Sequence, residues 1–181
     1  MELFTERGFE QTTVAEIARR AGLTERTFFR CFADKREVLF GGSGALRELL
    51  VSTVAGAPET AAPIDAVATA LEAAAVVLQE RRPYSRQRQT VIAANEELRE
   101  RELIKLASLS SALAEALRRR GVGDPAASLT AEAGIVVFKV AFERWIDESN
   151  QRDFLLLVRE TLDELGAVAA ATARMGQGTP T

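Results

Sequence analysis

The residues best suited to bind a charged partner in this chain of 181 residues are basic side chains gathered in one short segment. The six basic residues between positions 19 and 36 are Arg19, Arg20, Arg26, Arg30, Lys35 and Arg36. Only Glu25 and Asp34 oppose them, so the segment has a net charge of +4 in a protein whose formal net charge is −3. A local positive excess in an acidic protein is typical of a surface that binds phosphate groups. The alternative interpretation is a solvated helical face.

Most catalytic and metal sites need residue types that this chain lacks. It contains no histidine and one cysteine, Cys31. Zinc sites that combine histidine and cysteine are therefore excluded, as are Ser–His–Asp and Cys–His nucleophiles. No glycine-rich phosphate loop occurs, and no pair of carboxylates stands out. We expect no catalytic residues, no bound metal and no cofactor.

The composition, with 47% hydrophobic and 27% charged residues, is typical of a soluble globular protein. No run approaches the roughly 18 consecutive apolar residues of a membrane span, and no signal-peptide pattern opens the chain. A single cysteine agrees with a reducing compartment. These features predict a cytoplasmic protein with no membrane segment.

The residues around the basic segment predict two short helices joined by a tight turn. Thr13 stands three residues before Glu16, which is the spacing of a capping box at a helix start. Gly22 follows the first helix, where the turn needs a residue that adopts a left-handed conformation without steric cost. Thr24 can cap the second helix, and Leu23 is expected to fill the corner between the two.

This spacing favours a helix-turn-helix over an ordinary helical hairpin. Phe28 and Phe32, four residues apart, should pack back on the first helix. The second helix of such a motif enters the major groove of DNA with its N-terminal residues facing the bases. Arg26 and Thr27 are the candidates for base contact, because arginine can bind guanine O6 and N7 through two hydrogen bonds. Arg30 and Lys35 could neutralise phosphates.

Helical periodicity predicts an all-α fold with no sheet. The expected helices span 1–8, 13–21, 24–31, 34–55 with a break allowed at Gly41–Gly44, 63–82, 84–95, 97–120, 125–149 and 152–174. In the last one, apolar residues from Phe154 to Val168 recur at three- and four-residue steps and extend beyond what one neighbour would cover.

The expected domain organisation has three parts. Residues 1–45 form a helix-turn-helix DNA-binding domain with a short first helix, residues 46–175 a helical regulatory and dimerisation domain, and residues 176–181 a flexible tail. The Gly/Ala/Thr-rich stretch between Pro58 and Pro63 is expected to link the two domains.

The stretches Arg7–Ala18, Ala21–Thr24 and Phe28–Lys35 together resemble the tetracycline-repressor (TetR/AcrR) family of transcriptional regulators. The run Arg26–Arg30 is similar to an actinobacterial-type branch of that family. In many members a tyrosine that touches phosphate stands at the position of Phe29. The resemblance and the motif together give this set of expected DNA-contacting residues: Thr13, Thr24, Arg26, Thr27, Phe29, Arg30 and Lys35.

The resemblance implies an all-α homodimer that binds double-stranded DNA at a palindromic operator. It also implies that the last two helices pair with those of a second chain, and that a small-molecule effector in the middle helices relieves repression. Arg88, Phe138, Phe142 and Trp145 are candidates for that pocket, although aromatic residues at helical spacing usually belong to a core.

Family members usually have a longer first helix, so either this chain is truncated or its DNA-binding part is less well supported. The rival hypothesis is a helical ligand-binding or protein-interaction module that has lost DNA binding.

Overall fold

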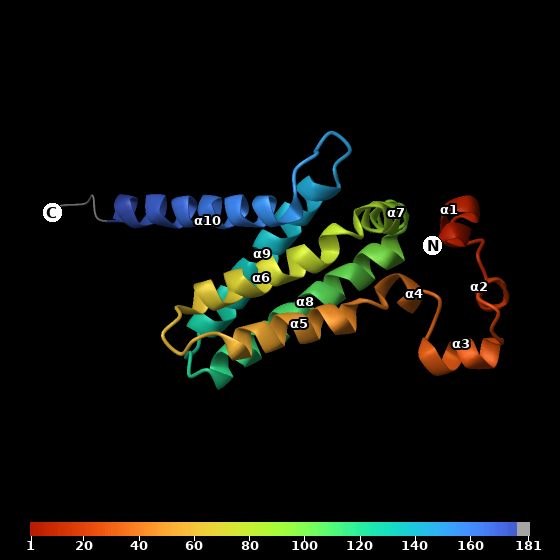
Figure 1. Ribbon diagram of the computed structural model, residues 1–181, viewed down its shortest axis with the longest axis horizontal. Coiled ribbons are helices and arrows are strands. Elements are labelled where there is room, and N and C mark those ends of the chain that lie inside the picture. Colours follow the sequence, from red (N-terminus) through yellow and green to blue (C-terminus); the bar gives the residue numbers. More distant parts are fainter. Residues whose placement is uncertain (177–181) are drawn as a thin grey trace. The chain divides into compact units, whose positions relative to one another are not determined.

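The computed structural model describes residues 1–176, and within that range the only regular secondary structure is α-helix, as the periodicity predicted (Figure 1). The expected tail falls, from residue 177 on, outside the described residues. In chain order the helices are α1 (Glu2–Arg7), α2 (Val14–Arg20), α3 (Glu25–Cys31), α4 (Glu37–Phe40), α5 (Ser43–Gly56), α6 (Pro63–Gln79), α7 (Arg82–Ala93), α8 (Glu96–Arg119), α9 (Ala126–Ile146) and α10 (Phe154–Gly176). The break allowed in the fourth expected helix occurs at Gly41–Gly42, between α4 and α5.

The chain divides into two compact units, each built from two separate stretches. The first unit combines Met1–Arg47 with Arg81–Ala107, and the second combines Glu48–Glu80 with the residues from Ser108 onward. Helix α8 therefore contributes its first turns to one unit and its remaining turns to the other. The linker predicted between Pro58 and Pro63 is wrong, because this stretch joins α5 to α6 inside the second unit.

An apolar core holds the short N-terminal helices of the first unit against α7 and the start of α8. Its buried members come from α1, α4, α7, α8 and the loop after α1: Phe4, Phe9, Leu39, Phe40, Val91, Ile92 and Leu98. Helices of four to seven residues are unstable in isolation, so this core supplies what their length cannot.

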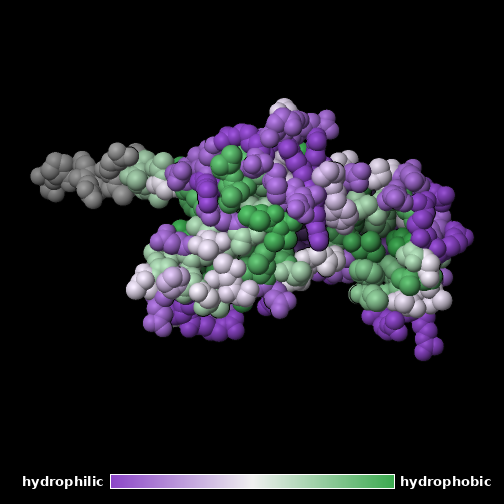
Figure 2. Space-filling view, viewed as in Figure 1, coloured by the Kyte–Doolittle hydropathy of each residue, from purple (hydrophilic) through white to green (hydrophobic). Residues whose placement is uncertain are grey.

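In the second unit, α6, α9 and α10 pack on one another around an aromatic cluster. The Trp145 and Phe154 rings stack with their centroids 4.7 Å apart, and both side chains are fully buried. Phe138 meets Phe154 edge-on at 5.8 Å. Apolar residues also remain at the surface, where Figure 2 shows green groups among the purple polar ones.

Among the described residues, only the stretch Glu37–Gly56 is long and apolar enough to be a candidate membrane span. The chain turns at Gly41–Gly42 within it, and Leu39, Phe40, Leu50 and Val54 are buried in the protein.

Helix α9 approaches α6 closely at Gly134. A Cβ atom added there would lie 2.5 Å from Cγ1 of Val67, a β-branched side chain that is fully buried and has no room to rotate away. Glycine at this position therefore allows the two helices to cross closely.

We expect Gly134→Ala to lower the free energy of unfolding by about 1–3 kcal/mol, because overpacking outweighs the roughly 1 kcal/mol that alanine gains over glycine in a helix. Gly166→Ala is the matched control, since Gly166 lies in α10 with no atom within 4 Å of the added Cβ. That control should be neutral or stabilising in urea denaturation. Equal effects of the two substitutions would contradict the close crossing.

Candidate DNA-binding site

The capping box predicted at the start of α2 is present. The Glu16 backbone N–H donates to Thr13 Oγ1 at 3.3 Å, and the Thr13 backbone N–H donates to Glu16 Oε2 at 2.9 Å. The hydrogen bond from the Thr13 backbone is the main reason that the pKa of Glu16 lies below its ordinary value. Helix α2 thus begins at the residue that the sequence indicates, with its first N–H groups satisfied.

The turn between α2 and α3 agrees with the predicted motif except at Leu23. Gly22 has a φ of 68°, in the left-handed region that glycine adopts at no cost. Thr24 caps α3 by accepting a hydrogen bond from the Thr27 backbone N–H at 3.2 Å. Leu23, expected to fill the corner, is instead 44% exposed, because Ala18 and Phe28 already fill the space between the two helices. Phe28 is buried, and its ring centroid lies 5.2 Å from that of Phe32. The packing of both rings on the first helix stays a prediction.

Helix α3 presents an exposed face that carries most of the expected DNA contacts. Arg26, Phe29 and Arg30 are exposed, with Phe29 at 54%. Within residues 1–176, neither Arg26 nor Arg30 makes a hydrogen bond or ion pair, so both guanidinium groups can reach an outside partner. Thr27 is half-buried, and its hydroxyl lies 3.0 Å from that of Thr24.

Lys35 differs from the other expected contacts because its ammonium group is bound to the protein. Nζ donates to the carbonyl oxygens of Phe9, Glu10 and Thr12 at 2.9, 3.3 and 3.4 Å. It also lies 4.3 Å from the centroid of the Phe9 ring. The phosphate contact expected of this residue stays a prediction.

Charged side chains around α4, which we call the α4 ion-pair cluster, join this helix to α8. Its members are Asp34, Arg36, Glu37, Glu97, Arg101 and Lys105. Arg101 Nε and Lys105 Nζ donate to the two carboxylate oxygens of Glu37 at 2.9 and 3.0 Å. Arg36 pairs with both Asp34 and Glu97. The three α8 members recur every four residues, so they lie along one edge of that helix.

Sequence reasoning missed the ion pairs that Glu37 makes with α8. Asp34 Oδ1 accepts the backbone N–H groups of Arg36 and Glu37 at 2.8 and 3.3 Å. Burial alone would raise the pKa of Glu37, but the hydrogen bonds from Arg101 and Lys105 hold it below its ordinary value. The regular spacing of Glu97, Arg101 and Lys105 was the only signal available in the sequence.

Two family models match separate parts of the chain. The model of bacterial regulatory proteins of the tetR family matches residues 1–40, and the model of the MftR C-terminal domain matches residues 61–170, more than half of the chain. The chain belongs to the TetR family. The helix-turn-helix described above is the part that the first of these models covers.

Similar proteins are described as transcriptional regulators. TcmR of Streptomyces glaucescens, an HTH-type transcriptional regulator, is 37% identical over 73 residues, which cover 40% of this chain and only 32% of TcmR. FadR of Thermus thermophilus, a TetR-family transcriptional repressor solved in complex with lauroyl-CoA, is 26% identical with a TM-score of 0.57, over 90% of this chain and 87% of FadR. A TetR-family regulator from Mesorhizobium loti, at 19% identity and a TM-score of 0.55 over 94% and 91% of the two chains, shares the fold.

The residues expected to bind an effector in this TetR-family chain are divided between the two units. Arg88 lies in the first unit, where Nε donates to the Leu39 carbonyl at 2.8 Å and Nη1 to Glu102 at 3.0 Å, and its guanidinium lies 4.9 Å from the Phe40 ring centroid. Phe138, Phe142 and Trp145 belong to the aromatic cluster of the second unit. Their membership of a ligand pocket stays a prediction.

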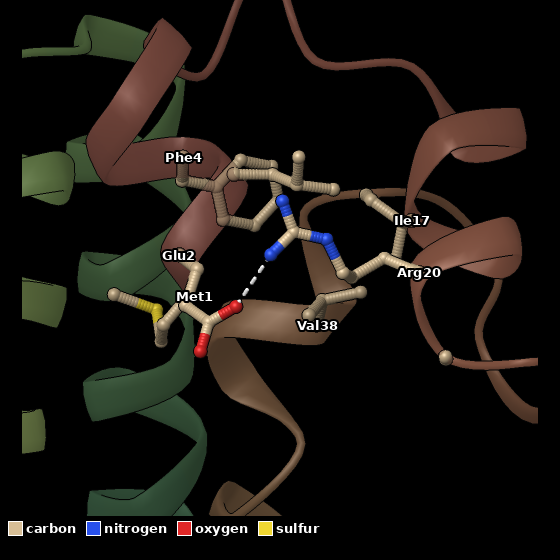
Figure 3. A pocket seen from close by; sticks show the side chains of 8 residues that line it. Met1, Glu2, Phe4, Ile17, Arg20 and Val38 are labelled. Carbon is tan, nitrogen blue, oxygen red and sulfur yellow. Dashed lines mark hydrogen bonds and ion pairs between the residues drawn. The ribbon is translucent and has the colours of Figure 1, made fainter.

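A cavity of about 300 Å³ lies among α1, α2 and α4 in the first unit. Its lining residues are Met1, Glu2, Leu3, Phe4, Ile17, Arg20, Ala21 and Val38. Figure 3 shows Arg20 extending toward Glu2, with Nη1 and Oε2 2.7 Å apart. Both side chains are mostly exposed, so this pair adds little stability. None of the residues expected to bind DNA or effector lines this cavity.

We expect Glu37→Gln to lower the free energy of unfolding by about 1–2 kcal/mol at pH 7, because hydrogen bonds to a charged group are lost. The folded-state pKa of Glu37 is lowered, so its contribution is present above the unfolded pKa of about 4.3 and is lost as the pH falls through the folded value. The difference between the two proteins in urea denaturation should therefore shrink in acid. Glu100→Gln, an exposed carboxylate on α8, should differ little from wild type at either pH. A pH-independent difference would contradict the ion pairing.

Proposed function

We propose that this TetR-family regulator binds a palindromic DNA operator as a cytoplasmic homodimer, is not an enzyme, and represses transcription until a small-molecule effector releases it. The observation that carries the DNA-binding part is the exposed face of α3, where Arg26 and Arg30 have no partner within the described chain. Both helix caps and the left-handed glycine turn support a working helix-turn-helix. The intact motif and the two unpaired arginines on its exposed face together disfavour the alternative, a module that has lost DNA binding.

We expect Arg26→Ala to cost about 1–3 kcal/mol of operator affinity and to relax base preference at one position in each half-site. Specific sites of this kind are held with dissociation constants of about 10⁻⁸ to 10⁻¹¹ M. The measurement is a gel-shift titration against DNA selected from a random double-stranded library. Arg99→Ala removes an exposed arginine from α8 and serves as the charge-matched control. Equal losses for the two substitutions would mean that α3 does not read bases.

The proposed dimer surface consists of apolar residues that α9 and α10 leave exposed in a single chain. On α9 these are Leu129, Val136 and Val140, spaced so that they follow one side of the helix, and on α10 Val168 is exposed while Leu162 and Leu165 are half-buried. Exposed apolar patches of this kind on soluble proteins mark interaction surfaces.

We expect Val136→Glu to convert the dimer to monomers in sedimentation equilibrium, because a buried unpaired charge costs several kcal/mol. Val136 is 54% exposed in one chain, so the substitution should leave the fold of each protomer intact. Val76→Glu on α6, at 60% exposure, is the matched control and should remain dimeric. A dimeric Val136→Glu protein would place the interface elsewhere.

We infer that the effector carries a long apolar chain. FadR, which matches this chain over 90% of its length, was solved with lauroyl-CoA, and the region 63–149 contains the clustered aromatic residues Phe138, Phe142 and Trp145. Pockets that bind such molecules are lined mostly by hydrophobic and aromatic side chains.

Lauroyl-CoA is therefore the first probe. Trp145 is the only tryptophan, so its fluorescence reports on the second unit alone, and we expect lauroyl-CoA to change it and to weaken operator binding. A tenfold weakening corresponds to a coupling free energy of about 1.4 kcal/mol, and by linkage the operator must weaken lauroyl-CoA binding by the same factor. Coenzyme A alone is the control for the nucleotide part. A fluorescence change with unaltered operator affinity would indicate a pocket without a switch.

A further inference from the structure

The ammonium group of Lys35 is already hydrogen-bonded within the protein, unlike the exposed guanidinium groups of Arg26 and Arg30. An ammonium group has three N–H donors, and each has a protein acceptor here: the carbonyl oxygens of Phe9, Glu10 and Thr12. The ring of Phe9 below the ammonium provides a further favourable contact, with Nζ 4.3 Å from its centroid. A phosphate could be bound only after these contacts were broken.

The carbonyls that Lys35 binds belong to the loop between α1 and α2, which is also held by the burial of Phe9 in the apolar core of the first unit. Gly8 leaves α1 with a φ of 81°, so the chain turns away from the helix at that point. Thr12 is buried, and its hydroxyl donates to the Gly8 carbonyl at 2.8 Å. Lys35 gives the Phe9 carbonyl a second donor beside the Thr12 backbone N–H at 3.3 Å. It also satisfies the carbonyls of Glu10 and Thr12, whose bonding would otherwise be left to water.

The residues joined by the Lys35 hydrogen bonds flank the helix-turn-helix in the sequence. Residues 9–12 come immediately before the cap of α2, and Lys35 follows α3 and precedes α4. The Lys35 contacts therefore close a loop that contains α2, the Gly22 turn and α3. Closing a loop removes conformational freedom from everything inside it.

We propose that Lys35 is a positioning residue, which holds α3 in its DNA-binding orientation by tying the start of α4 to the α1–α2 loop, and that it does not bind a phosphate. This proposal rests on the proposed function, because its main test measures binding to operator DNA. It assigns the electrostatic contact with DNA to Arg26 and Arg30, which the protein leaves free.

The test compares the salt dependence of operator binding by wild type, Lys35→Met and Arg30→Met. Each lost phosphate contact lowers the slope of log affinity against log salt by about 0.9. Arg30→Met removes one such contact from each protomer of the proposed dimer, so we expect it to lower the slope by about 1.8. Lys35→Met should lose at least about tenfold in affinity, as expected when hydrogen bonds to a charged group are lost, and keep the wild-type slope. A slope reduced by about 1.8 in Lys35→Met would overturn the proposal.

Two further measurements separate positioning from a general loss of stability. In the Lys35→Met background, Arg26→Ala should cost less affinity than in wild type, because a displaced α3 no longer makes the full base contact. Additive effects, measured well below the unfolding temperature, would overturn the proposal. Lys35→Arg keeps the charge and several donors, and it should restore most of the lost affinity.

Hydrogen exchange tests the role of Lys35 without DNA, so failure of this proposal can be distinguished from failure of the proposed function. If wild type bound no selected DNA, the proposed function would fail, but Lys35→Met should still increase exchange of the α2 and α3 amides relative to wild type. Unchanged exchange in that variant would overturn the tie itself, whatever the protein binds.

Discussion

The helices that form the DNA-binding part of this protein are too short to hold their own shape. Helices α1, α2 and α3 have six, seven and seven residues, and α4 has four. Helix nucleation is costly, and isolated helices shorter than about 12 residues are marginal even in favourable sequences. The orientation of the α3 face must therefore come from contacts outside α3. The rest of the first unit can be understood as the set of contacts that supplies it.

Those contacts are of two physical kinds, and they act at different places. The apolar core of Phe4, Phe9, Leu39 and Phe40 with α7 and α8 supplies most of the burial, but packing of this kind is tolerant of small shifts. Hydrogen-bonded charges are directional. They occur where the chain changes direction: Lys35 at the α1–α2 loop, and the α4 ion-pair cluster beside the turn into α5. We infer that apolar burial stabilises the unit while the charged contacts define its geometry.

Much of this arrangement could be predicted from local sequence, because its causes are local. The capping box at Thr13, the cap at Thr24 and the left-handed turn at Gly22 each depend on residues within four positions of one another. Helix ranges followed from periodicity for the same reason. The prediction that Leu23 fills the corner was wrong, because its burial depends on how closely α2 and α3 approach. Ala18 and Phe28 already fill the space between these two helices. The Lys35, Glu37 and Arg88 contacts join residues 14 to 68 positions apart, and no local pattern contains that information.

The arginines illustrate why residue type alone does not identify a DNA contact. Arg36, Arg88 and Arg101 have the same side chain as Arg26 and Arg30, but the first three use their planar forks on carboxylates and a carbonyl inside the protein. An arginine already paired with a carboxylate contributes no net charge at its position and offers few donors to DNA. The positive excess between Arg19 and Arg36 is therefore smaller than the sequence suggests, because Arg20 pairs with Glu2 and Arg36 with Glu97, two carboxylates that lie outside the segment. Within the described residues, Arg19 at the end of α2 and Arg26 and Arg30 on α3 have no carboxylate partner, so the positive charge that remains for DNA lies on the two helices of the helix-turn-helix.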